Sequence, residues 1–80
     1  MLKNNELLNY IKIDVVDSQC SADLIVNDFS FTLEPAGNEI QVWIDNEMKF
    51  VYNSFEEFLN KFIIDGKPLI EQIDLLKYNY

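Results

Sequence analysis

The sequence predicts an α+β fold in which an antiparallel β-meander of three strands, or of four, is followed by two C-terminal amphipathic helices packed on one face of the sheet. Apolar and polar residues alternate through residues 29–52, which is typical of half-buried strands. From Ser54 onward the apolar residues recur every three or four positions, which is typical of helices. The chain has 80 residues, 49% of them hydrophobic, so we expect residues 1–80 to form a single small globular domain.

Three runs of alternating residues form the predicted meander. Their inward-facing side chains are all apolar: Phe29, Phe31 and Leu33 in the first run, Ile40, Val42 and Ile44 in the second, and Met48, Phe50 and Tyr52 in the third. We predict the register of the first hairpin by setting apolar residues opposite one another. Leu33 opposite Ile40, with Phe31 opposite Val42, requires a four-residue loop at residues 35–38, whose Pro-Ala-Gly-Asn sequence suits a turn.

The register of the second hairpin is predicted in the same way. Setting Val42 opposite Phe50 requires a three-residue loop at residues 45–47 and places Met48 on the apolar face. A loop that is one residue shorter would set Val42 opposite Lys49, a charged residue on the apolar face. We therefore reject the shorter loop.

The predicted first helix begins after Ser54, which has Glu57 three residues later, as in a capping box. Residues at helical spacing form its apolar face: Phe55, Phe58, Leu59, Phe62 and Ile63. Gly66 then suits the end of this helix, and Pro68 suits the first turn of the next. The second, shorter helix has an apolar face of Leu69, Ile70, Ile73 and Leu76.

The first quarter of the chain fits two structures. Residues at helical spacing share one face, namely Leu7, Leu8, Ile11 and Val15, but residues 11–15 also alternate as a strand would. We favour a short helix from about Asn4 that passes into a strand at residues 11–16. Residues 22–26 are the candidate fourth strand, after a loop that contains Cys20.

The charge of the chain excludes several functions. Fourteen Asp and Glu stand against six Lys, with no Arg and no His, so the formal net charge is −8. His is the side chain that titrates near neutral pH, and Arg is the residue that binds phosphate with two parallel hydrogen bonds. A strongly acidic surface repels nucleic acid and anionic lipid and attracts basic proteins. We therefore expect no direct binding of nucleic acid and no binding to membranes.

The residue patterns do not indicate catalysis. Cys20 has no His to act as its base, so we expect a buried or half-buried thiol without a catalytic role. Asp14, Asp17 and Asp23 carry the oxygen ligands that Ca²⁺ and Mg²⁺ prefer, but their spacing matches no calcium loop. The sequence also contains no zinc-ligand pattern and no phosphate-binding loop. We predict a protein that is not an enzyme and that has no cofactor and no metal site.

The composition also bears on where the protein acts. Ile, Asn, Lys, Phe and Tyr are abundant and Arg and His are absent, as in AT-rich coding sequences, which suggests a low-GC bacterium, or a phage or mobile element of one. A single Cys, and an N-terminus without the apolar stretch of a signal peptide, predict a cytoplasmic protein. No apolar run approaches the ~20 residues of a membrane span.

These features predict a small acidic binding protein. The first hypothesis is an inhibitor, immunity protein, antitoxin or DNA mimic that occupies a basic surface of a nucleic-acid-handling partner, such as a nuclease. The alternative is an accessory or structural interaction module whose acidity serves only solubility. The predicted partner-binding residues are an aromatic anchor on the polar face of the sheet and four acids near the hairpin turns: Trp43, Glu34, Glu39, Asp45 and Glu47. For Trp43 a second interpretation is open, in which the N-terminal segment covers that face and buries the indole.

Overall fold

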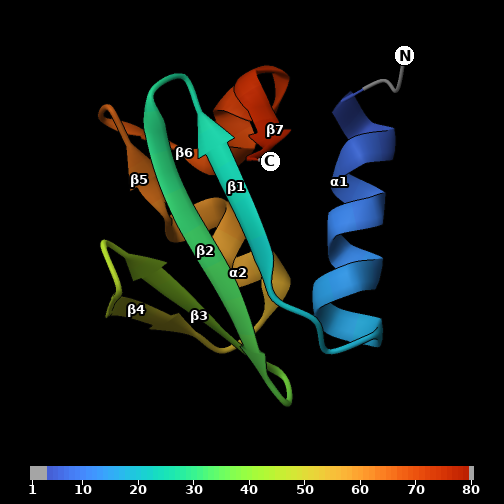
Figure 1. The fold of residues 1–80 in the computed structure, drawn as a ribbon. Helices are drawn as coiled ribbons and strands as arrows, with labels where there is room; N and C mark the ends of the chain where they lie inside the picture. The colour runs from blue at the N-terminus through green and yellow to red at the C-terminus, as the bar shows by residue number, and fades with distance from the viewer. Residues whose placement is uncertain (1–3, 80) are drawn as a thin grey trace.

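The computed structural model describes residues 4–79. Helix α1 (Asn4–Lys12) continues into the π-helical turn η1 (Ile13–Asp17), and the strands β1 (Ala22–Val26), β2 (Phe29–Ala36), β3 (Glu39–Ile44) and β4 (Glu47–Tyr52) follow (Figure 1). After helix α2 (Phe55–Lys61) come the short strands β5 (Ile63–Ile64) and β6 (Lys67–Pro68), the 3₁₀ segment η2 (Leu69–Leu75) and strand β7 (Leu76–Tyr78).

Within this described range, five strands form one antiparallel sheet in the order β4-β3-β2-β1-β7, and β5 pairs with β6 in a separate small hairpin. The predicted architecture, a meander of three or four strands followed by two C-terminal helices, is therefore wrong. The protein is an α+β fold with one helix at the N-terminal end and another in the middle of the chain. The chain then returns to the sheet, where β7 pairs with β1.

The segment predicted as the second helix forms no regular α-helix: it is the 3₁₀ segment η2, interrupted at Gln72, followed by strand β7. Asp65 and Gly66 have positive φ angles of 54° and 80°, and they form the turn between β5 and β6 instead of separating two helices. Gln72 has non-helical angles (φ −135°, ψ 34°). Its side-chain amide is buried and donates hydrogen bonds to the carbonyl oxygens of Ile64 (2.7 Å) and Lys67 (3.0 Å), which fastens the hairpin to η2.

The register of the β2–β3 hairpin differs from the prediction by two residues. Val42 lies opposite Leu33 rather than Phe31, and the turn consists of residues 37–38 alone, with a glycine at φ +65°. A shift of two residues leaves every side chain on its predicted face, so the apolar alternation could not distinguish the two registers. Pro35 therefore lies within β2, beyond the point where β1 pairs with that strand, and a missing N–H is tolerated there.

In the β3–β4 hairpin, the predicted pairing of Val42 with Phe50 is confirmed but the predicted loop is wrong. The turn has two residues, both with positive φ (52° and 66°), and it is the shorter loop that the sequence argument rejects. A β-bulge explains how the two-residue turn and the pairing of Val42 with Phe50 can coexist. The register shifts after Val42, and Lys49 is the extra residue on β4. Met48 consequently lies opposite Trp43, on the face away from the apolar side where we predicted it.

The N-terminal quarter is helical as far as Asp17, so the predicted strand at residues 11–16 is wrong. Ile11 and Val15 lie four positions apart on one helical face and are both buried, whereas Ile13 is exposed. The Tyr78 hydroxyl donates a hydrogen bond of 2.8 Å to Oδ2 of Asp14 and so connects β7 to η1. The strand predicted at residues 22–26 is present as β1.

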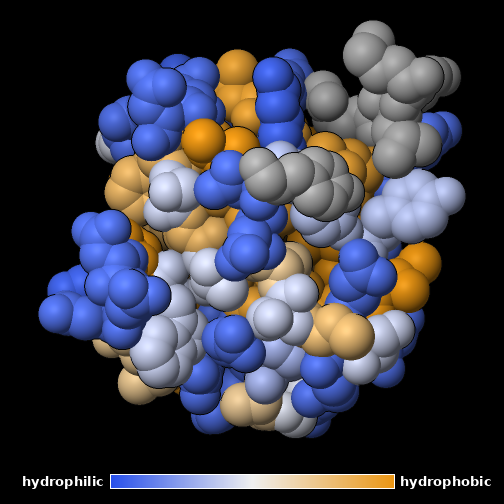
Figure 2. All heavy atoms as spheres, in the orientation of Figure 1, coloured by the Kyte–Doolittle hydropathy of each residue, from blue (hydrophilic) through white to orange (hydrophobic). Residues whose placement is uncertain are grey.

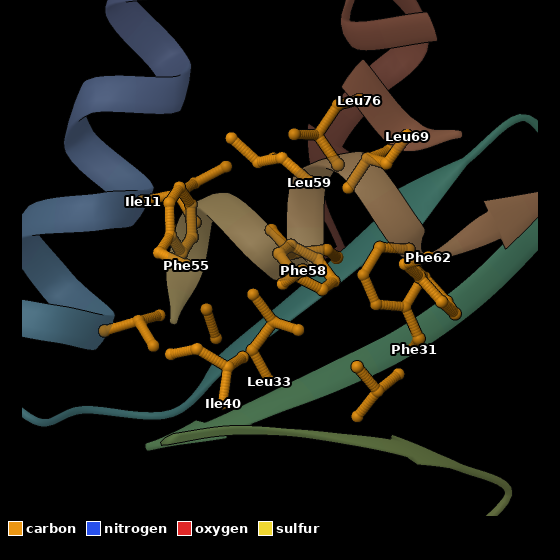
Figure 3. Packing of buried hydrophobic residues seen from close by; sticks show 14 of the residues in the cluster. Ile11, Phe31, Leu33, Ile40, Phe55, Phe58, Leu59, Phe62, Leu69 and Leu76 are labelled. Atoms are coloured by element: carbon orange, nitrogen blue, oxygen red, sulfur yellow. The ribbon is translucent and has the colours of Figure 1, made fainter. Parts of the chain in front are cut away.

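The helical segments and one face of the sheet enclose the hydrophobic core (Figure 3). Phe58 and Phe62 of the α2 region lie at its centre, where they face Phe31 on β2. Helix α2 begins as predicted, because the Ser54 hydroxyl accepts a hydrogen bond of 3.0 Å from the amide of Glu57. The apolar face of α1 packs into the same cluster, so these elements lie on one side of the sheet.

Candidate partner-binding face

The face of the sheet that points away from the core is not covered by any described element. In Figure 1, α2 lies behind the sheet and the near side of β1 and β2 is open. The register sets four residues in one row across this face, one on each of four neighbouring strands: Asp23, Thr32, Trp43 and Met48. Because side chains alternate along a strand, this open face carries the residues that lie between the core positions.

A hollow of about 380 Å³ lies in the middle of the open face. Its lining comes from β1, β2 and β3, from the turn that follows β3 and from the residue after β7, and it is mainly polar: Asp23, Ser30, Thr32, Glu34, Trp43, Asp45, Asn46 and Asn79. We name this feature the acidic hollow. Three of the five predicted site residues, Trp43, Glu34 and Asp45, lie together in it.

Trp43 is half-buried and lies along its own strand. Its Nε1–H donates a hydrogen bond of 3.0 Å to Oε1 of Gln41, two residues earlier on the same face of β3. The described part of the N-terminal segment does not cover this residue as the second interpretation expected, because α1 packs into the core on the other side of the sheet. Two exposed apolar side chains of β4, Met48 and Val51, lie opposite Trp43 and Gln41.

Asp23 also lines the acidic hollow, although the sequence points to it only as a candidate ligand of Ca²⁺ or Mg²⁺. Its Oδ1 accepts a hydrogen bond of 2.6 Å from the Thr32 hydroxyl of β2. The alternation of Ala22, Asp23 and Leu24 did indicate that Asp23 points away from the core. The pairing of β1 with β2, which brings it to the hollow, follows from no local pattern.

Glu39 and Glu47 do not join the acidic hollow. Glu39 begins β3 whereas Asp45 follows its end, so the strand separates them by roughly 20 Å. Glu47 lies opposite Ile44, which lies on the core-side face of β3 rather than on the face of Trp43, and its Oε2 is 2.7 Å from Nζ of Lys49. This hydrogen bond and the charge of Lys49 lower the pKa of the Glu47 carboxyl below its usual value.

The three carboxylates of the acidic hollow form no ion pair within 4.0 Å with the lysines that the structure describes, although Glu47 and, more weakly, Asp45 raise the pKa of the Lys49 ammonium group. Ion pairs between described residues join Lys49 to Glu47 and Lys61 to Glu57, and none within 4.0 Å involves Asp23, Glu34 or Asp45. The hollow therefore combines negative charge with an indole ring. Both features suit contact with cationic side chains, through ion pairs and through the face of the ring.

The other candidate groups do not assemble into a reactive site. Cys20 is exposed, so the expectation of a buried or half-buried thiol is wrong, and its Sγ lies 3.5 Å from the carbonyl oxygen of Ser18. Asp14 accepts the hydrogen bond from Tyr78, on a different element from Asp23. Among residues 4–79, no group of three His, Cys, Asp or Glu side chains is arranged to hold a metal ion.

No helix in the described part of the chain is both long enough and apolar enough to cross a membrane. Comparison with protein-family models, with curated proteins and with solved structures finds no significant match to this chain. Its function is therefore inferred from its own residues and their geometry.

Proposed function

We propose that this protein is a small acidic binding protein, of the inhibitor, immunity-protein, antitoxin or DNA-mimic kind, that occupies a basic surface of a partner that handles nucleic acid. The observation that carries the proposal is the acidic hollow. Asp23, Glu34 and Asp45 lie around the half-buried ring of Trp43, on a sheet face that the described elements leave open.

The charge of the chain supports a basic partner. A net charge of −8 on 80 residues accelerates encounters with positively charged proteins through long-range attraction. Proteins that bind nucleic acid expose Lys and Arg for phosphate contacts, and carboxylates placed on those side chains compete with the phosphates. In this proposal the protein neither binds nucleic acid directly nor catalyses a reaction.

A second function is supported by the apolar residues of the same face. Trp43 and Met48 lie opposite each other, and exposed Val51 lies on the same face of β4. In this alternative the protein is an accessory interaction module whose apolar contacts choose the partner, and its acidity serves solubility. Docking of a strand along β4 is disfavoured, because a bulge and a lysine at position 49 interrupt that edge.

The first experiment captures the partner from extracts at low and at high salt and asks whether DNA displaces it. The proposal predicts a basic partner that is retained at low salt, is lost at high salt and is released by added DNA, because both ligands compete for the same cationic side chains. A partner that is retained equally at both salt concentrations and is unaffected by DNA would favour the accessory-module alternative.

The second experiment measures association with the captured partner. A triple variant, Asp23→Asn, Glu34→Gln and Asp45→Asn, removes the charge of the hollow and should slow association, most strongly at low salt. The control variant neutralises three exposed acids elsewhere in the molecule: Glu39→Gln, Glu56→Gln and Glu71→Gln. Both variants have the same net charge, so a specific role of the hollow predicts the larger effect for the first. Equal effects would mean that only the overall charge matters, and a larger effect of the control would move the site away from the hollow, to the surface around these three acids.

Trp43→Ala should act on dissociation instead. A partly desolvated aromatic anchor contributes to the lifetime of a complex, whereas steering charges contribute to its rate of formation. The expected result is faster dissociation with little change in association. Unchanged kinetics would remove Trp43 from the binding surface.

A further inference from the structure

A second exposed surface lies at one end of the core and is apolar. Phe29, Phe50 and Ile63 have exposed fractions of 36%, 46% and 54%. The rings of Phe29 and Phe50 both pack on the ring of buried Phe62, at centroid distances of 6.4 Å and 5.8 Å, and Ile63 follows Phe62 in the chain. We name these three exposed residues the phenylalanine patch.

The patch is exposed because the covering elements end beside it. Helix α2 stops at Lys61 and leads directly into the β5–β6 hairpin, while β4 is an edge strand on which only Tyr52 is buried. Figure 1 shows β5 and β4 on the same side of the molecule, and Figure 2 shows hydrophobic surface on that side between two hydrophilic projections. Exposed apolar clusters of this kind, bordered by polar residues, are typical of protein interfaces.

The segment that carries Ile63 is held in place. The buried amide of Gln72 binds two carbonyl groups of the β5–β6 hairpin, and the amide of Leu69 donates a hydrogen bond of 2.8 Å to the carbonyl oxygen of Phe62. A fixed surface loses little conformational entropy when a partner binds. The hairpin therefore presents Ile63 in a geometry that is suited to docking.

Two carboxylates border the patch on the side of Phe29. A hollow of about 350 Å³ beside this ring is lined by Asp28, from the β1–β2 turn, and by Asp65, from the β5–β6 turn. Among the described residues no lysine forms an ion pair with either carboxylate within 4.0 Å, and this includes Lys67, which lies two positions after Asp65. The border is therefore complementary to positive charge.

We propose that the phenylalanine patch docks an apolar side chain of a partner segment that is flanked by lysine or arginine. The apolar side chain contacts Phe29, Phe50 and Ile63, and the flanking cations meet Asp28 and Asp65. The charge argues for such a segment over a second copy of this chain, because a second copy has a net charge of −8 and brings a second acidic border. The inference rests on the proposed function only in taking the partner to be basic.

The experiment uses a synthetic peptide of two Lys-Leu-Ala-Lys-Leu-Ala-Lys repeats and a reference peptide in which every Leu is Gln. Amide chemical shifts of the isotope-labelled protein are followed during titration with each peptide at moderate salt. The leucine peptide should shift Phe29, Phe50, Ile63 and their neighbours, and the reference peptide should not. Ile63→Thr should weaken binding of the leucine peptide about fivefold or more.

The matched control is Ile13→Thr, the same substitution at a residue of η1 with a similar exposed fraction of 48%. It should leave binding of the leucine peptide unchanged. If both variants weaken binding equally, or if both peptides shift the patch to the same extent, the inference is wrong. Sedimentation of the protein alone provides a further test, because self-association that Ile63→Thr abolishes would assign the patch to a second copy and also overturn the inference.

The two peptides separate this inference from the proposed function. The reference peptide retains all the positive charge, so shifts at Asp23, Glu34 and Trp43 report on the acidic hollow alone. Shifts at the hollow with none at the patch would refute the inference and leave the proposed function in place. Shifts at the patch alone, on titration with the leucine peptide, would support the inference and count against the hollow.

Discussion

Replacing Phe58 with Ala tests how much the packing of α2 against the sheet contributes to the free energy of unfolding. Phe58 is 1% exposed, and its ring lies at centroid distances of 5.5 Å to 6.5 Å from four other aromatic rings: Phe31, Tyr52, Phe55 and Phe62. These rings come from β2, from β4, from α2 itself and from the residue that follows α2. Truncation therefore removes contacts between the helix and two strands at once.

The cost can be worked from the buried area. A buried Phe removes roughly 150–250 Å² from water, and truncation to Ala gives up roughly 100–150 Å² of this, which at about 25 cal/mol per Å² corresponds to about 2.5–3.8 kcal/mol. A cavity among rigid rings collapses poorly, so the expected loss lies in the range of about 3–5 kcal/mol for Phe to Ala in a core. Ala favours a helix more than Phe by about 0.5 kcal/mol, which offsets a small part. The loss is a large share of the ~5–15 kcal/mol that stabilises a typical domain.

The assay is urea unfolding at fixed salt, followed by circular dichroism and by the fluorescence of Trp43, the single tryptophan of the chain. Phe50→Ala is the matched control, because Phe50 is 46% exposed on the edge strand β4 and should lose only about 1–2 kcal/mol. A loss below about 1 kcal/mol for Phe58→Ala, or a loss no larger than that of the control, would mean that α2 is peripheral and would refute this reasoning.

Three further predictions concern a helix cap, a hairpin and a titrating group. Ser54→Ala should lower the free energy of unfolding by about 1 kcal/mol, whereas Ser54→Asp, which can still cap α2, should lose much less; equal losses would contradict the capping role. Gln72→Leu leaves two hairpin carbonyl groups without their donor, so it should cost about 1–3 kcal/mol and accelerate amide exchange in β5 and β6, and unchanged exchange would rule out this role. Burial, and secondly the charge of Glu57, raise the pKa of Tyr52. Its contribution to stability is therefore present below the unfolded pKa of about 10 and is lost as the pH rises through the folded pKa. The difference in tyrosinate absorbance between the protein and Tyr52→Phe should show that Tyr52 titrates late, and that it titrates earlier in Glu57→Gln; no change in that variant would contradict the assignment.

The features that local sequence could predict are those that depend on neighbouring residues. The cap of α2 is predicted from Ser54 and Glu57, which lie three positions apart, and the hydrogen bond between them confirms it. The pairing of Val42 with Phe50 was also predicted correctly, although the turn that joins their strands was not. The shorter loop conflicts with a regular ladder, which would set Val42 opposite Lys49. The bulge removes this conflict by leaving Lys49 as the extra residue, and the alternation of apolar and polar residues along β4 does not indicate a bulge.

Features that depend on pairing between strands far apart in the sequence could not be predicted from local patterns. Strand β7 is three residues long and pairs with β1, 50 to 54 positions earlier in the chain, so no periodicity could reveal it. Its Leu76 was assigned to a helical face because its spacing from Ile73 and Leu69 suits a helix. The same limit applies to the register of β2 and β3, since a shift of two residues preserves both faces.

The candidate site was predicted in part, for the same reasons. Alternation places Glu34 and Trp43 on the open face, and this holds in either register, so both residues line the acidic hollow. Predicting that Asp23 lies in the hollow would have required the pairing of β1 with β2, which no local pattern indicates. Glu47 was expected beside Asp45, but the bulge sets it opposite Ile44 and beside Lys49.

Strand β4 contributes side chains both to the open face beside the acidic hollow and to the phenylalanine patch, because of its bulge. In a regular ladder Met48 and Phe50 would both face the core side, and Lys49 would face the open side with Val51. With Lys49 as the extra residue, Met48 moves to the open face opposite Trp43, while Phe50 keeps its contact with Phe62. The edge strand thus carries apolar side chains on both of its faces, one beside the acidic hollow and one in the phenylalanine patch. A partner that wraps around this edge meets both surfaces, and the interrupted ladder favours contact through side chains over addition of a strand.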